Sequence, residues 1–105
     1  MAALVFTASA CGTIIDVPAN TPFTVELEEN PTTGYRWDFE ADPGLEVVAS
    51  VYAPARPGGA GGGGMRQVQF RTNAPGQFVV RGKLWRSWAG EQSSIRICEI
   101  TVLVS

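Results

Sequence analysis

Apolar and polar residues alternate along most of this chain of 105 residues. The clearest case is the stretch 23–28, in which Phe23, Val25 and Leu27 are separated by polar residues. This period of two is typical of a β-strand with one buried face and one solvated face. No window keeps apolar residues at the spacing of an amphipathic helix. The same pattern, bounded by Gly, Pro and Asn, predicts strands over residues 3–8, 12–17, 23–28, 35–40, 45–53, 65–72, 78–85 and 95–104.

The last predicted strand contains a change of phase. Ile95 and Ile97 fall on one of its faces. The apolar residues that follow fall on the other face: Ile100, Val102 and Val104. An extra residue in one strand of a pair would bring both groups to the same side, so we expect a β-bulge near Cys98 or Glu99.

The number of strands bounds the fold class. Seven or eight short strands within 105 residues predict an all-β, immunoglobulin-like β-sandwich, although the Cys and Trp spacing of antibody domains is not matched. The chain has no internal repeat and no linker, so we expect a single domain over residues 1–105. A domain of this size can hold a hydrophobic core without a metal.

Composition removes several classes of function. The chain contains no histidine, which excludes Ser-His-Asp and Cys-His catalysis and leaves too few ligands for most zinc sites. A net charge of −2 argues against nucleic-acid binding, which requires a basic face. An enzyme could use Glu26, Glu28 and Glu29, but Glu26 and Glu28 share the wet face of one strand, so solvation explains them. We expect a non-enzymatic protein with no cofactor, no metal and no membrane span.

The segment 30–35, Asn-Pro-Thr-Thr-Gly-Tyr, connects two predicted strands and restricts its own backbone. Pro31 fixes its own φ and drives Asn30 toward an extended conformation. The two threonines are stiff at χ1, and Gly34 can adopt a positive φ. Such a loop loses little entropy on binding. By itself, this pattern favours an ordinary connection between strands.

Two further segments could carry function. Gly58–Gly64 lacks the Gly-Lys-Ser/Thr sequence and the helix of a phosphate-binding loop, so we interpret it as a hairpin tip that a partner can approach closely. Arg86 and Trp88 lie in a short segment that ends in Ala89–Gly90. An exposed Trp beside an Arg has the composition of an interface hot spot, although a stacked pair could simply stiffen the loop. In an immunoglobulin-like order these loops lie at one end of the sandwich.

Together the three segments resemble the loop motifs of the chagasin-type inhibitors of papain-like cysteine peptidases. Those motifs are Asn-Pro-Thr-Thr-Gly-aromatic, Gly-x-Gly-Gly and Arg-Pro-Trp. This chain matches them at Asn30–Tyr35, Gly61–Gly64 and Arg86–Trp88, in the same order. The likeness covers nearly the whole chain.

The resemblance implies an immunoglobulin-like sandwich that inhibits a papain-like peptidase reversibly, competitively and without a covalent step. Three loops, 30–35, 58–66 and 85–91, would form a wedge in the active-site cleft of the peptidase. Thr32 and Thr33 would lie over the catalytic Cys-His pair, and Trp88 would pack on aromatic surface of the peptidase. The protein itself would be a monomer. The implied peptidase-binding residues are Asn30, Pro31, Thr32, Thr33, Gly34, Tyr35, Gly61, Gly63, Gly64, Met65, Arg66, Arg86 and Trp88.

Two positions depart from the family motifs. Ser87 replaces the proline of the third motif, and Gly62 with the extra glycines at 58 and 59 loosens the second loop. Looser loops lose more entropy on binding, on the order of 1 kcal/mol for each immobilised element. We therefore expect Ser87→Pro to slow dissociation from the peptidase.

Other interpretations remain open at this point. The same loops could belong to an immunoglobulin-like adhesion or ligand-recognition module with no peptidase target. Cys11 and Cys98 could form a disulfide, worth about 4 kcal/mol over such a span, or remain two buried thiols. Localisation also stays open: the protein would be periplasmic or secreted if a signal peptide has been removed, and otherwise cytoplasmic.

Overall fold

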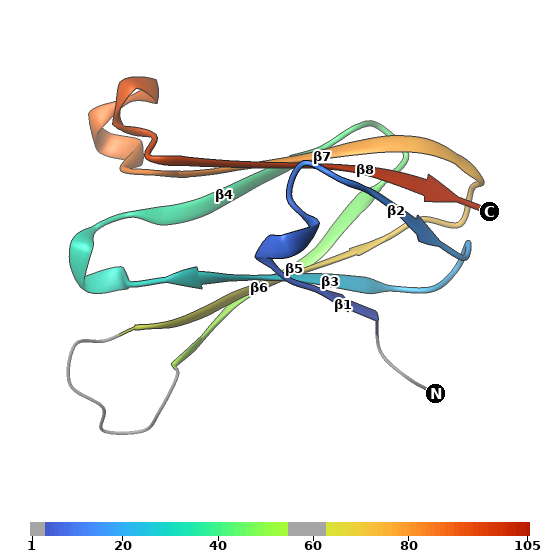
Figure 1. The fold of residues 1–105 in the computed structure, drawn as a ribbon, viewed down its shortest axis with the longest axis horizontal. Helices are drawn as coiled ribbons and strands as arrows, with labels where there is room; N and C mark the ends of the chain where they lie inside the picture. The colour runs from blue at the N-terminus through green and yellow to red at the C-terminus, as the bar shows by residue number, and fades with distance from the viewer. Residues whose placement is uncertain (1–3, 55–62) are drawn as a thin grey trace.

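A computed structural model describes residues 4–54 and 63–105, apart from the side chain of Pro31. Two four-stranded sheets pack face to face, as the two layers of Figure 1 show. The first sheet has the order β1 (Leu4–Phe6), β3 (Phe23–Glu29), β6 (Gly64–Arg71) and β5 (Glu46–Pro54). The second has the order β2 (Ile14–Val17), β8 (Arg96–Val104), β7 (Gly76–Trp85) and β4 (Arg36–Ala41). The predicted all-β, immunoglobulin-like sandwich is confirmed.

Short 3-10 turns are the helical elements of the described residues: η1 (Ala8–Ala10), η2 (Pro31–Thr33), η3 (Ser87–Ala89) and η4 (Glu91–Ser93). None of the helices found in residues 4–54 and 63–105 is long and apolar enough to cross a membrane. The first predicted strand, 3–8, is shorter than expected, because the chain leaves the first sheet after Phe6 and crosses through η1 to the second sheet.

The alternating pattern forms the core between the sheets. On β3 the side chains of Phe23, Val25 and Leu27 are at most 2% exposed. Phe23 stacks on Phe70 of β6 with ring centroids 5.3 Å apart. Each such side chain contributes roughly 1.5–3 kcal/mol by leaving water. The second sheet supplies the opposite half of the core: Val17, Trp37, Val80, Leu84, Cys98, Ile100 and Val102.

The prediction of a β-bulge near Cys98 or Glu99 is wrong. The pairing of β7 with β8 runs without interruption from Gly76↔Val104 to Leu84↔Arg96. Cys98 continues the inward row of β8, and the two isoleucines before it face outward, where Ile95 is 57% and Ile97 is 67% exposed. The sheet irregularity lies instead in β5, between Val47 and Ala49.

Cys11 and Cys98 form a disulfide, with their Cα atoms 4.8 Å apart. The bond joins the crossover between β1 and β2 to the inner face of β8. The loop between them spans 87 residues, for which the chain-entropy model gives about 4 kcal/mol of stabilisation. This settles the choice that the sequence leaves open between a bridge and two free thiols.

The arrangement of the strands brings the functional candidates to one end of the sandwich. In Figure 1 the β3–β4 connection and the β7–β8 connection lie on the left, together with the end of β5 and the start of β6. The C-terminus lies at the opposite end. The predicted convergence of the loops is therefore confirmed for their described parts.

Candidate functional site

The first loop, residues 30–35, is held by hydrogen bonds within itself. The side-chain oxygen of Asn30 accepts from the backbone N–H of Thr32 at 3.1 Å and from its hydroxyl at 2.6 Å. The backbone carbonyl of Asn30 accepts from the hydroxyl of Thr33 at 2.7 Å. Gly34 then turns the chain with φ of +83°. The loop is thus a preformed 3-10 turn that begins with a side-chain cap.

This geometry determines what the two threonines offer to a partner. Both side chains are exposed, but both hydroxyl protons are donated to Asn30. A partner therefore meets hydroxyl oxygens that can accept hydrogen bonds, rather than free donors.

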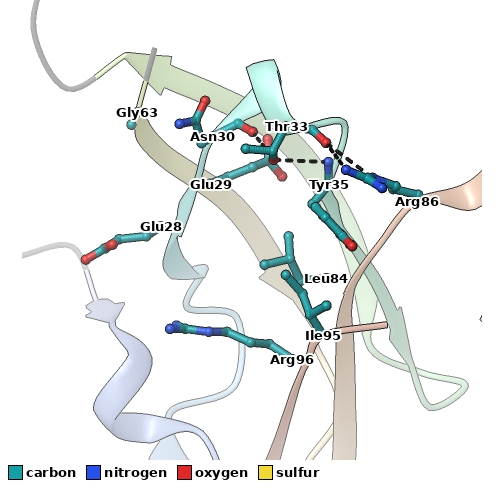
Figure 2. Close-up of a pocket in the computed structure, with 11 residues that line it drawn as sticks. Glu28, Glu29, Asn30, Thr33, Tyr35, Gly63, Leu84, Arg86, Ile95 and Arg96 are labelled. Atoms are coloured by element: carbon teal, nitrogen blue, oxygen red, sulfur yellow. Dashed lines mark hydrogen bonds between the residues drawn. The ribbon is translucent and has the colours of Figure 1, made fainter. Parts of the chain in front are cut away.

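Arg86 joins the first loop to the third. Its Nε and Nη2 donate to the carbonyl oxygen of Thr33 at 3.2 and 2.9 Å, as Figure 2 shows. Its guanidinium also stacks over the ring of Tyr35, with 4.3 Å from Cζ to the ring centroid. A Cβ at Gly34 would lie 3.5 Å from Nε of Arg86, which is an ordinary contact, so the positive φ rather than lack of space favours glycine here. The prediction gave Arg86 a direct contact with a peptidase, whereas its hydrogen bonds here hold the two loops together.

Trp88 is the exposed residue of the third loop. Its side chain is 76% exposed, although its ring lies 5.6 Å from the Arg86 guanidinium carbon. The sequence left open whether this Trp forms a hot spot or merely stiffens the loop. A large aromatic ring with three-quarters of its surface in water is available to a partner.

Ser93 is a residue that the sequence analysis missed. Its hydroxyl oxygen accepts from the backbone N–H of Arg86 at 3.0 Å and lies within hydrogen-bond distance of the carbonyls of Arg86 and Gly90. It thereby stabilises the two consecutive turns η3 and η4. A serine placed three residues after Gly90 is a signal for such a side-chain-to-backbone turn.

Part of the second loop lies outside the described residues. The predicted contacts of Gly61, and the effect of Gly62 and of the glycines at 58 and 59, fall in this part. Gly63 is exposed, and Gly64 is buried at the start of β6. A Cβ at Gly64 would come within 2.4 Å of the carbonyl oxygen of Ala53, so only glycine fits there. Met65 is half-buried on the outer face of the first sheet.

The prediction that Arg66 contacts a peptidase does not agree with its placement. Arg66 is 8% exposed, and its Nη2 forms an ion pair with Oε2 of Glu29 at 2.7 Å. The side chain points between the sheets, on the same side of β6 as Val68 and Phe70. Arg66 therefore lies behind the loop surface rather than on it.

A hollow of about 580 Å³ opens at the roots of the loops. Figure 2 shows Leu84 and Ile95 at its base, with Tyr35 and Arg86 along one side and Gly63 near the opposite rim. Within the described residues no group of three His, Cys, Asp or Glu side chains could hold a metal ion. The site is therefore a surface of loops over a partly apolar hollow.

Comparison with known proteins identifies the family. The model of the chagasin family peptidase inhibitor I42 matches residues 16–102, which is most of the chain. This chain belongs to the chagasin family of peptidase inhibitors. The three segments that resemble the family motifs all lie inside the matched region. Members of this family inhibit peptidases and are not enzymes.

Solved structures show the same fold at low identity. The cysteine protease inhibitor EhICP2 from Entamoeba histolytica matches with a TM-score of 0.85 at 19% identity, over 97% of this chain and 95% of that one. The solution structure of amebosin matches with a TM-score of 0.83 at 24% identity, over the full length of both. PbICP-C, solved in complex with falcipain-2, matches with a TM-score of 0.63 at 15% identity, over 98% of this chain and 91% of that one. A search of curated proteins finds no match.

Proposed function

We infer that this member of the chagasin family is a reversible, competitive inhibitor of papain-like cysteine peptidases. Its three loops, 30–35, 58–66 and 85–91, enter the active-site cleft of the peptidase and exclude substrate. The family supports this target class, as do two structural neighbours, one a cysteine protease inhibitor and the other solved in complex with falcipain-2. The observation that carries the proposal is the bidentate contact of Arg86 with Thr33, which presents the first and third loops as one preformed surface.

The geometry also explains how such a loop could occupy a peptidase without being cut. A scissile peptide must lie extended, with its carbonyl oxygen free to enter the oxyanion hole. Pro31–Thr33 instead forms a compact 3-10 turn, and the carbonyl oxygen of Thr33 already accepts two bonds from Arg86. Reaching an extended form would break these bonds and those to Asn30. We therefore expect occupation of the cleft without a covalent step.

Binding energy would come from few groups. Trp88 offers the large exposed ring that interface hot spots favour, and the threonine oxygens can accept bonds from donors in the cleft. Because the first loop is already ordered, little additional entropy is lost when it binds.

The test is a titration of papain and several related peptidases with a fluorogenic substrate. We expect the apparent inhibition constant to rise linearly with substrate concentration, activity to return on dilution, and the inhibitor mass to stay unchanged. No inhibition by micromolar protein across the panel would contradict the proposal and favour an adhesion or ligand-recognition module.

We further infer that the protein acts in an oxidising compartment, such as the periplasm or the extracellular space. The Cys11–Cys98 disulfide supports this, because such bonds persist where thiols are not kept reduced. Fractionation of the source cells, followed by detection of the oxidised protein, checks it. Recovery from the cytoplasm alone would contradict it.

A further inference from the structure

One ion pair behind the loops takes no part in the inhibitory contacts proposed above. Of the ion pairs found among the described residues, only Glu29–Arg66 has both side chains buried, at 0% and 9% exposure. Removing two charges from water is costly, and well-packed apolar residues often stabilise a fold as well as a buried ion pair does. Stability alone therefore gives little reason for a charged pair at this position.

Glu29 closes the base of the first loop. It is the last residue of β3, directly before Asn30, and its Oε1 accepts from the backbone N–H of Trp37 at 2.7 Å. Trp37 lies in β4, just beyond the loop, and its indole Nε1 donates to the carbonyl oxygen of Glu28 at 2.9 Å. Two hydrogen bonds thus join the strand that enters the loop to the strand that leaves it.

Arg66 extends this contact to the strands that carry the second loop. It lies in β6, two residues after Gly64, and its Nε and Nη2 donate to the same carboxylate at 2.7–3.3 Å. Its Nη1 reaches Oγ of Ser50 on β5 at 3.4 Å, and the guanidinium lies 5.9 Å from the ring centre of Tyr52. One carboxylate is therefore bonded both to the base of the first loop and to the hairpin that bears the second.

We propose that Glu29 and Arg66 are positioning residues, which fix the first loop relative to the adjacent ends of β5 and β6 and thereby slow release of the peptidase. The proposal rests on the proposed inhibitory function. Several charge-assisted bonds in a dry site have a narrow range of angles, so they define one arrangement where an apolar pair would allow several. Loss of the pair should leave the first loop intact, and its position relative to the ends of β5 and β6 less defined. The complex should then form at nearly the same rate and dissociate faster.

The main variant replaces both residues, as Glu29→Gln with Arg66→Met. Gln keeps an acceptor for the Trp37 amide, and the double change leaves no unpaired buried charge. We expect peptidase release to be about 10-fold faster and association to change less than about 2-fold, which would be a loss of about 1.4 kcal/mol. Arg66→Lys should restore part of the slow release, because it keeps the charge but not the bidentate geometry.

The matched control is Glu46→Gln with Arg71→Met. This pair joins β5 to β6 in the same sheet, at the end away from the loops, and its side chains are 67% and 57% exposed. The control variant makes the same changes of charge and size as the main variant, but away from the loops. Both rate constants should equal those of the unmodified protein.

A second measurement needs no peptidase. Hydrogen exchange of the Trp37 amide in the free protein should be about 10-fold faster in the main variant, because Arg66 no longer fixes its acceptor. Exchange of the Thr33 amide, which is bonded within the first loop, and exchange in the middle of β8 should be unchanged. Failure of the unmodified protein to inhibit would contradict the inhibitory function, and amide exchange would still test the positioning of the loops. Unchanged release, or unchanged exchange at the Trp37 amide, would overturn the proposal.

Discussion

The first and third loops reach a fixed shape in different ways. The first loop, residues 30–35, makes its main hydrogen bonds between its own members, with Asn30 as their common partner. The third loop depends on residues outside its motif: Ser93 holds its turns, and the carbonyl oxygen of Thr33 in the first loop accepts the hydrogen bonds of Arg86. A self-contained loop can be recognised from six residues of sequence. A loop held by distant partners cannot, and its rigidity can change without a change in its motif.

The strongest test of this comparison removes the contact that the two loops share. Arg86→Ala would delete two charge-assisted hydrogen bonds to Thr33 and the stacking on Tyr35. Bonds to charged groups are worth about 1.5–3 kcal/mol, so the inhibition constant should rise by about 100-fold. The measurement is inhibition of a sensitive papain-like peptidase.

Arg81→Ala is the matched control for this change. Arg81 lies on the same strand, β7, and its side chain is 50% exposed in surface ion pairs with Asp42 and Glu99. Its removal should leave inhibition unchanged. If both variants inhibit equally well, the contact between the loops is not needed for binding.

A smaller effect should follow from opening the first loop alone. Asn30→Ala removes the acceptor for two donors of Thr32, each a neutral bond worth about 1 kcal/mol, so inhibition should weaken by about 30-fold. Asn30→Asp keeps an acceptor oxygen and should bind nearly as well as the unmodified protein. Equal loss in both variants would show that the Asn30 amide nitrogen, and not its oxygen, matters.

The smallest effect concerns Ser87, where the family motif has proline. The residue before it, Arg86, has φ −100° and ψ 104°, an extended conformation that a following proline favours, and Ser87 opens the turn η3. Because Ser93 already holds the turn, Ser87→Pro alone should slow release by only about 2-fold.

Combining this change with the loss of Ser93 sharpens the comparison. Ser93→Ala should speed release by about 5-fold, and adding Ser87→Pro should recover most of that loss, since each is worth about 1 kcal/mol. Dissociation rates from surface-immobilised peptidase measure both. If Ser87→Pro slows release equally in the unmodified protein and in the Ser93→Ala variant, then Ser93 does not replace the rigidity that proline would give the loop.

Much of the fold could be predicted, because the alternation of apolar and polar residues identifies which side chains of each strand face inward. The same rule places Arg66 inward, since it is in phase with Val68 and Phe70, and it places Glu29 inward with Leu27. The motif alone gave Arg66 a surface role, so the periodic signal was the better guide. Alternation failed in β8, where two exposed isoleucines suggested a bulge that does not exist.

Long-range partners could not be predicted from local pattern. The bond between Arg86 and Thr33 joins residues 53 positions apart, and neither residue type specifies the other. The same holds for Glu29 and Arg66, which are 37 positions apart. Such pairs become visible only when the topology has brought the loops to one end of the sandwich.

The disulfide has a consequence for the lifetime of an inhibitor that works among peptidases. All three loops lie between Cys11 and Cys98, so a single cut in any of them leaves two fragments covalently joined. The β3–β6 pairing would hold the pieces in register after a cut in the first or second loop, and the β7–β8 pairing would do so after a cut in the third. An occasional nick would therefore produce a two-chain molecule with its binding surface in place, rather than two products that diffuse apart.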